Sequence, residues 1–354
     1  MNKLNNFTKS IFAVLLGLLA GAILILFIGK NPLEGFYYLF RGGTMNMERI
    51  GNTIATATTL ILTGLSVGFA FKTGLFNIGA AGQMLMGGLA ATTVGLTVDL
   101  PKFLLLPLML VAAMIGGGIW GSIPGFLKAL FNVHEVVCTI MTNWIAYWIV
   151  FYTVPAYLKG QFLETESANI PFQASLRVEW LTSIFRGSFI NLGIFVAVIS
   201  VLVIKFILDK TTLGYELKAV GYNRHAAEYA GIKVNRDIVL SMTIAGILAG
   251  IGGFVFYAGY SSNIQIGVLP AQGFDGIAVA LLGTNNPLGI LAAALFFGLL
   301  HSGKGFMNAM IDVPPQIADT IIAIIIYFTA ASLLIERVWN RIRAKRKDKK
   351  NGGA

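Results

Sequence analysis

Long apolar runs alternate with short polar segments along almost the whole chain. Ten runs approach the roughly 17 to 25 residues that an α-helix needs to cross the hydrocarbon core of a bilayer. The predicted spans are residues 10–28, 54–71, 76–96, 103–123, 136–154, 189–208, 238–257, 274–282, 288–301 and 317–335. The eighth run is short and bounded by glycine, which is typical of a broken or re-entrant element. The first run follows two lysines but carries no cleavage motif, so we expect a retained helix.

Composition supports the same class of protein. The chain has 354 residues, of which 56% are hydrophobic and only 12% charged, too few charges to cover the surface of a water-soluble globule. We therefore expect an all-α, polytopic membrane protein forming a single transmembrane domain over residues 1–354. Of the 26 lysines and arginines, most lie in the segments that would share one side of the membrane, including a basic tail at 336–354. This bias predicts that both termini are cytoplasmic.

Three segments between the predicted spans are long, and they suggest where partners bind. Residues 29–53 and 155–188 are expected outside, and the second holds a stretch at 175–187 that predicts a short interfacial helix. Residues 209–237 are expected inside. They contain an alanine-rich helix at 224–230 that ends at Gly231, a residue suited to a helix C-terminus. Such a helix could dock a partner protein, or it could be a solvated connector.

Motifs for nucleotide or metal chemistry lack the context that they need. Residues 116–121 match a glycine-rich dinucleotide loop but lie inside an apolar span with no preceding strand. Residues 298–305 resemble a phosphate loop, with Gly305 where a Ser or Thr must stand. His134, Glu135 and Cys138 are adjacent without metal-site spacing. We predict no catalytic site, no metal and no bound cofactor, and assign most glycines in the spans to close helix packing.

Uncharged polar side chains inside the spans are the candidate solute contacts, because such groups are costly in lipid unless they face a cavity or one another. These groups, with aromatic neighbours that could stack on a planar base, are Phe76, Asn77, Gln83, Thr139, Asn143, Trp144, Tyr147 and Asn285. The alternative is that the amides bind neighbouring helices. Asp275 and Asp319 lie near predicted helix starts, where we expect each carboxylate to cap amides rather than couple transport to an ion.

Four stretches together resemble a known family. They are residues 74–88 (GLFNIGAAGQMLMGG), 134–146 (HEVVCTIMTNWIA), 273–289 (GFDGIAVALLGTNNPLG), and the 209–237 segment with Gly214, Ala219, Gly221, Asn223, Ala226, Ala227, Gly231 and Ile232. This pattern is similar to permeases of ABC importers of the ribose, nucleoside and branched-chain amino acid group, and most similar to nucleoside permeases. One departure is Ala81, where many relatives have glutamate.

The resemblance implies a type II ABC importer-like permease fold in the bacterial cytoplasmic membrane. It implies a transmembrane subunit that moves nucleosides using ATP hydrolysed by separate ATP-binding subunits, with a second permease subunit, identical or related, and an external substrate-binding lipoprotein. Coupling to the ATPase would involve Gly221, Asn223, Ala226, Ala227 and Gly231, and the substrate pathway Phe76, Asn77, Gln83, Thr139, Asn143, Trp144 and Asp275. Two alternatives are a simple-sugar permease of the same group and an ion-coupled secondary transporter, and a membrane enzyme ranks last.

Overall fold

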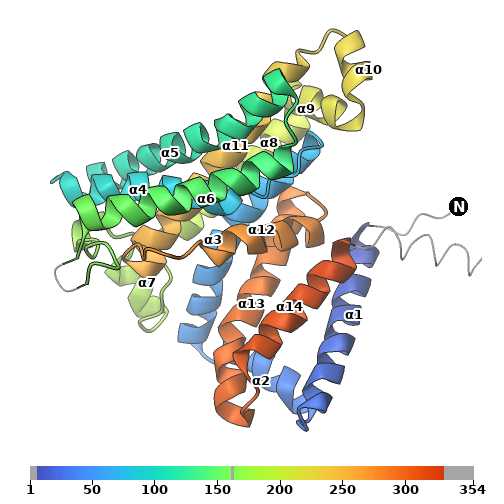
Figure 1. Ribbon diagram of the computed structural model, residues 1–354. Helices are drawn as coiled ribbons and strands as arrows, with labels where there is room; N and C mark the ends of the chain where they lie inside the picture. Colours follow the sequence, from blue (N-terminus) through green and yellow to red (C-terminus); the bar gives the residue numbers. More distant parts are fainter. Residues whose placement is uncertain (1–5, 161–162, 331–354) are drawn as a thin grey trace, which may run out of the picture. The chain divides into compact units, whose positions relative to one another are not determined.

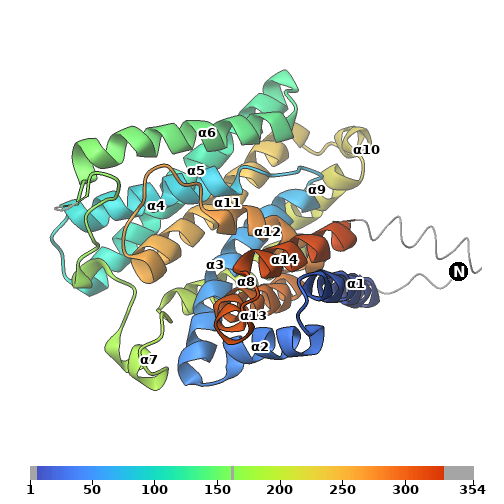
Figure 2. The ribbon, with the colours of Figure 1, turned by 60° about the horizontal axis from the view of Figure 1, so that its bottom comes forward.

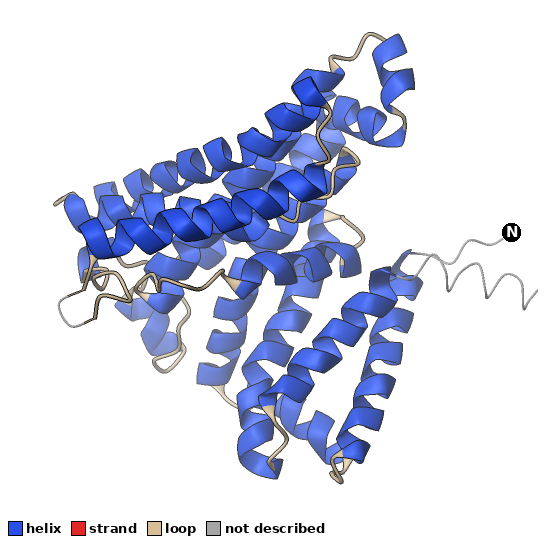
Figure 3. Ribbon diagram, viewed as in Figure 1, coloured by secondary structure: helices blue, strands red, loops and turns tan. Residues whose placement is uncertain are grey.

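The computed structural model describes residues 6–160 and 163–330. Within these residues the chain is helices and loops, with isolated bridges but no strand (Figure 3), which confirms the all-α prediction. The α-helices are α1 (Asn6–Phe27), α2 (Pro32–Thr44), α3 (Met47–Lys72), α4 (Ala80–Thr97), α5 (Lys102–Phe131), α6 (Glu135–Thr153), α7 (Glu179–Ile184), α8 (Gly193–Lys210), α9 (Thr212–Tyr222), α10 (Arg224–Tyr229), α11 (Val234–Val255), α12 (Ala271–Leu282), α13 (Pro287–Ile311) and α14 (Pro315–Ala330). Shorter π- and 3₁₀-turns are η1 (Val154–Leu158), η2 (Phe172–Ala174) and η3 (Phe256–Ser261).

The structure confirms apolar helices long enough to cross a membrane, but it does not confirm the count of ten spans that hydropathy predicts. Five helices of the described chain are long and apolar enough to cross a bilayer. The number is six if α1 and α2, whose axes bend by 118° at their junction, form one span. The predicted spans 76–96 and 189–208 are present as α4 and α8 but do not meet that standard, and 317–335 runs beyond the described residues. Helix α2 lies within the 29–53 segment, which is expected outside the membrane.

Contacts divide the chain into two compact units, residues 1–41 with 303–354 (unit 1) and residues 42–302 (unit 2). In unit 1, α1 packs on α14, and Gly17 and Gly21 lie directly against Ile325 and Ile321. The absence of a side chain at these two glycines brings the helices together. Unit 2 contains the candidate functional regions.

The interior of unit 2 is built on glycine contacts between α4, α5 and α11, which lie side by side (Figure 2). A Cβ atom at Gly117 would come within 2.7 Å of Gly250 Cα, and one at Gly121 within 2.8 Å of Gly246 Cα. Glycine at both positions of each pair lets the backbones approach, which confirms that the 116–121 motif serves helix packing. It lies inside α5, so a dinucleotide turn is excluded there.

Helix α12 is a half-length element that begins inside the bundle. Its first residues lie against Ala81 of α4, and a Cβ on Gly273 would be 2.7 Å from the Cβ of Ala81. Helix α12 then follows the C-terminal half of α3, with Gly276 against Thr63 and Ala280 against Gly68. At about 18 Å it is too short to span a bilayer, and the irregular segment 262–270 leads into it from η3. The eighth predicted run is therefore a broken element.

Candidate functional site

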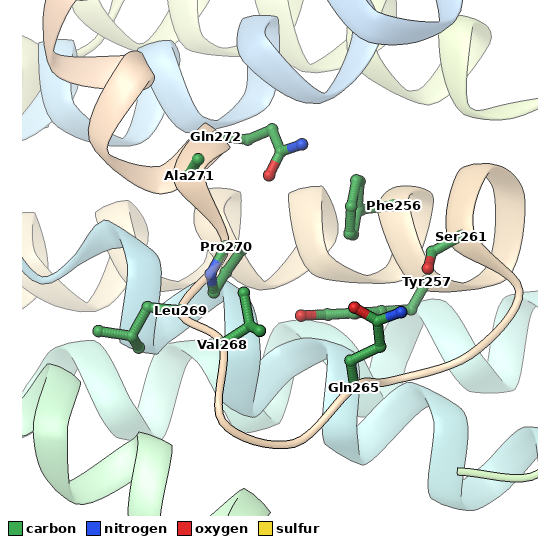
Figure 4. A pocket seen from close by; sticks show the side chains of 9 residues that line it. All are labelled: Phe256, Tyr257, Ser261, Gln265, Val268, Leu269, Pro270, Ala271 and Gln272. Carbon is green, nitrogen blue, oxygen red and sulfur yellow. The ribbon is translucent and has the colours of Figure 1, made fainter. Parts of the chain in front are cut away.

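The two ends of α11 define the geometry of unit 2. Helices α9 and α10 lie at its N-terminal end, which we call the α10 end (Figure 1). Helix α11 is about 33 Å long, and at its opposite end lies a partly open cavity of about 250 Å³. The cavity is lined by Phe256, Tyr257, Ser261, Gln265, Val268, Leu269, Pro270, Ala271 and Gln272. Figure 4 shows these side chains gathered where the start of α12 and segment 262–270 face the end of α11.

Aromatic rings form one wall of the cavity because the helix widens into the π-turn η3. Phe256 stacks on Tyr260 with ring centroids 5.7 Å apart, and it meets Tyr257 edge to face at 5.0 Å. Tyr257 is only 5% exposed and packs over Gly88 of α4. Single π-turns are frequent at functional sites, since they turn side chains out of the regular helical register.

The opposite wall, segment 262–270, is held by the long 155–188 segment. The backbone N–H of Ser167 donates to Ile264 O at 2.9 Å, and the N–H of Ile264 donates to Ser167 Oγ at 3.0 Å. Arg177 closes the end of η3 by donating to Gly259 O and Tyr260 O, both at 2.8 Å. Burial lowers the pKa of the Arg177 guanidinium below its ordinary value. The wall is thus anchored by hydrogen bonds to backbone groups.

The cavity offers hydrogen bonds and ring faces without formal charge. Among the nine described residues that line it, none is acidic or basic, while Gln265, Gln272, Ser261 and Tyr257 bring donors and acceptors. Mostly apolar walls with a few polar groups are the usual form of a small-molecule site. This lining suits a neutral, partly planar, polar solute and provides no cation for a phosphate.

Asp275 lies deeper on α12, one turn beyond Ala271 and on the same helical face. Its Oδ2 is 3.4 Å from Nε2 of His301 on α13, and the two side chains are 23% and 19% exposed. The predicted capping role for Asp275 and Asp319 is wrong, because neither lies in the first turn of its helix. Each carboxylate instead faces a basic side chain, and in unit 1 Lys304 Nζ donates to Asp319 Oδ1 at 2.9 Å.

The other predicted pathway residues gather at the start of α4. Asn77 Nδ2 donates to Gln83 Oε1 at 2.9 Å, and Gln83 Nε2 donates back to Asn77 Oδ1 at 3.2 Å. Asn143 of α6 accepts from Gly82 N at 2.8 Å and donates to Ile78 O at 3.0 Å. All three amides are buried. Their hydrogen bonds join α6 to the unwound segment 73–79 and α4, which is the arrangement expected for amides that bind neighbouring helices.

The remaining predicted pathway residues lie around that amide cluster in different ways. Thr139 donates to Glu135 O within its own helix at 2.8 Å. Phe76 is half-buried, with its ring 5.1 Å from that of Phe71. Trp144 is 51% exposed on the outside of α6, where its ring contacts Tyr147. The structure therefore brings the amides together but does not bring Trp144 to them.

The segment predicted for coupling forms the expected short helix. Helix α10 is capped by Asn223, whose Oδ1 accepts from His225 N and Ala226 N at 3.0 and 3.1 Å. Gly231 ends the turn at a φ of 84°, where an L side chain is strained. Ala227 is 4% exposed. It belongs to a buried cluster with Leu75, Val220 and Val234, so it anchors α10 to its own chain.

The outward face of α10 carries His225, Ala226, Glu228 and the 96%-exposed Tyr229. Gly221, just before α10, lies against the backbone of Lys72 and Gly74. The predicted coupling segment 209–237 and the unwound segment 73–79 are therefore in direct contact.

The sequence-based interpretation missed the cavity residues altogether. Gln265 and Gln272 stand in or beside a loop and carry no motif. The signal that could have found them is the break between the seventh and eighth apolar runs, because discontinuous helices place their ends in membrane-embedded sites.

Residues 49–330 match the family of permease components of branched-chain amino acid transport systems, and the chain belongs to that family. It is a multi-pass membrane protein. It is 41% identical, over 98% of its length and 99% of the relative's, to the guanosine ABC transporter permease protein NupP of Bacillus subtilis.

Two other relatives extend this comparison. The chain is 40% identical to the nucleoside ABC transporter permease protein NupB of Lactococcus lactis over 99% of both chains. It is 31% identical to the glucose ABC transporter permease protein TsgB13 of Haloferax volcanii, over 92% of this chain and 88% of the relative. No solved structure gives a significant match.

Proposed function

We propose that this chain is the transmembrane subunit of an ATP-driven importer of nucleosides. The observation that carries the proposal is the similarity over nearly the full length to one guanosine and one nucleoside permease. The chain itself would catalyse no reaction. It would work in the cytoplasmic membrane, with both termini inside, beside a second permease subunit. Separate subunits would bind ATP, and an external lipoprotein would deliver the solute.

The cavity supports a nucleoside as the solute. Phe256 and Tyr257 offer ring faces for a planar base, while Gln265 and Gln272 offer amide donors and acceptors for its edge. Buried polar groups that lose their partners cost about 1–3 kcal/mol each, so such a site discriminates against solutes that leave them unpaired.

The α10 end supports coupling to an ATP-binding subunit. Tyr229 projects almost fully from α10, and large exposed aromatic side chains are frequent anchors of protein interfaces. Asn223 and Gly231 fix the two ends of the helix, Ala227 holds it to this chain, and Gly221 passes its movement to segment 73–79. Ala226 lies on the outward face, where it would contact the partner. In this scheme the hydrogen bonds of Asn77, Gln83 and Asn143 keep segment 73–79, α4 and α6 together during the conformational change. Phe76 and Thr139 lie beside these amides near the substrate pathway.

Uptake of radiolabelled guanosine by cells producing the complete transporter tests the proposal. We expect saturable uptake that stops when the ATP-binding subunit loses its catalytic carboxylate and that persists when an ionophore collapses ion gradients. Excess unlabelled nucleosides should compete, and leucine should not. Uptake by this chain alone that an ionophore abolishes would contradict the proposal and favour an ion-coupled carrier.

A second candidate is a simple-sugar importer, because the chain is also 31% identical to a glucose permease. The same competition separates the two. Full competition by ribose, galactose or glucose without competition by nucleosides would favour the sugar assignment.

A further inference from the structure

Asp275 and His301 form a partly buried acid–base pair between α12 and α13 in an apolar unit. Ionisable groups in the membrane part of a protein are costly, and they usually mark solute or ion pathways. The Asp275–His301 distance of 3.4 Å is long for a hydrogen bond, and Nε2 of His301 is buried without one. In the described part of the chain, the Asp275 carboxylate accepts no hydrogen bond. The pair therefore keeps hydrogen-bonding capacity.

The position of the pair relates it to the cavity. Ala271 lines the cavity, and Asp275 follows one turn later on the same face of α12, a rise of about 6 Å. That is the scale that separates the base of a nucleoside from its ribose hydroxyls. A base held between Phe256, Tyr257 and the glutamines would direct its sugar toward α12.

The chemistry of a carboxylate selects among the groups of such a solute. An ionised carboxylate only accepts hydrogen bonds, and its two oxygens can accept from two adjacent hydroxyls. The 2′ and 3′ hydroxyls of ribose are such a pair, and acidic side chains bind ribose hydroxyls in dinucleotide sites. The cavity lining itself offers no carboxylate. Glu166 beside Gln265 already accepts a hydrogen bond from Asn263, whereas Asp275 on α12 keeps acceptor capacity for the diol.

We propose that Asp275 binds the vicinal 2′ and 3′ hydroxyls of a ribonucleoside on its way through unit 2, and that His301 positions the Asp275 carboxylate. The inference rests on the proposed function and adds a requirement for the diol. It makes the transporter selective for ribonucleosides over 2′-deoxy and 2′,3′-dideoxy analogues. Free ribose carries the same diol but lacks a base to occupy the cavity, so it would bind weakly.

The experiment compares initial uptake of guanosine, 2′-deoxyguanosine and 2′,3′-dideoxyguanosine at saturating concentrations by the complete transporter. An external binding protein contributes equally to wild type and variant. The ribo-to-deoxy uptake ratio of a variant, divided by that of the wild type, therefore reports the contribution of the permease to selectivity alone. Asp275→Asn and His301→Gln are the test variants. Asp319→Asn is the matched control, because it removes the carboxylate of another acid–base pair, with Lys304, in unit 1.

We expect Asp275→Asn to lower the ribo-to-deoxy ratio about 10-fold or more through loss of guanosine uptake, because it removes a charged hydrogen-bond acceptor. Uptake of the dideoxy analogue should be unchanged, which also shows that the variant is folded. His301→Gln should lower the ratio by a smaller factor, and Asp319→Asn should leave it unchanged. If Asp275→Asn is poorly produced, Asp275→Glu keeps an acceptor and should retain part of the preference.

Equal loss of all three substrates at normal abundance would assign Asp275 a purely structural role and overturn the inference. An unchanged ratio in Asp275→Asn would overturn it as well, and so would complete loss of the preference in Asp275→Glu, which keeps the carboxylate. Excess free ribose should not slow wild-type guanosine uptake. Full competition by ribose would show that binding does not depend on the base. If the wild type takes up none of the three nucleosides, the proposed function itself fails, which is a different outcome from a changed ratio.

Discussion

Replacement of Gly250 by alanine tests whether helix packing in unit 2 depends on the glycine contacts. A methyl group there would meet the carbonyl oxygen of Ala113 far inside van der Waals contact and would lie 3.0 Å from Gly117 Cα. Both obstacles are backbone atoms, which cannot rotate away. Favourable contacts need about 3.5 Å, so α11 and α5 would have to separate by about 1 Å. We expect the free energy of unfolding to fall by about 1–3 kcal/mol, the usual range for overpacking.

Gly305→Ala is the matched control, because Gly305 is also helical, yet a methyl group there would meet nothing within 4 Å. Alanine is the better helix former by about 1 kcal/mol, so this variant should be equal to or more stable than the wild type. The measurement is thermal unfolding of the purified chain in detergent, followed by the fraction that remains monodisperse. Equal melting temperatures for the two variants would refute the packing argument.

The remaining predictions concern single side chains at known contacts. Asn143→Leu should destabilise the chain by about 2–4 kcal/mol because it leaves two buried backbone groups unpaired, whereas Trp144→Ala, at an exposed position, should leave the melting temperature nearly unchanged. Tyr229→Ala should weaken copurification of the ATP-binding subunit at normal permease abundance, whereas Ala227→Asp should lower abundance itself, since it buries an unpaired charge. Arg177→Met should reduce uptake and expose the 155–188 segment to protease, because it removes two hydrogen bonds to η3.

Features determined by local sequence were predicted well. The apolar run 103–123 corresponds to α5, and the helix at 224–230 agrees with α10 to within one residue because its cap, Asn223, and its end, Gly231, are local signals. The run at 76–96 starts four residues late, at Ala80. Asn77 accepts from Gly79 N and pairs with Gln83, and these side-chain bonds compete with a helical turn.

Features that depend on distant contacts were not predictable. Hydropathy gives the length of a run but not where its helix begins relative to other helices, so it could not place the start of α12 against Ala81. The roles expected for Asp275 and Asp319 failed for the same reason, since their basic partners are 26 and 15 positions away in the chain. Ala81 itself is fully buried against Gly273, which leaves no space for a longer side chain at this position.

The irregular backbone of unit 2 explains why a neutral polar solute suits this chain. Non-helical backbone is tolerated at membrane depth only where protein groups or a polar cavity satisfy it. Amide side chains satisfy segment 73–79, and the 155–188 segment satisfies much of 262–270.

The start of α12 differs, because the N–H groups of Ala271 and Gln272 precede its first helical hydrogen bond and border the cavity. That end of the helix also carries the positive part of its dipole, while the Asp275 carboxylate stands one turn deeper. An anion would be attracted by the positive end of the α12 dipole and repelled by the Asp275 carboxylate. A cation would be repelled by the dipole and attracted by the carboxylate. A solute with hydrogen-bond acceptors at one end and hydroxyl donors at the other satisfies both, and a nucleoside has this arrangement.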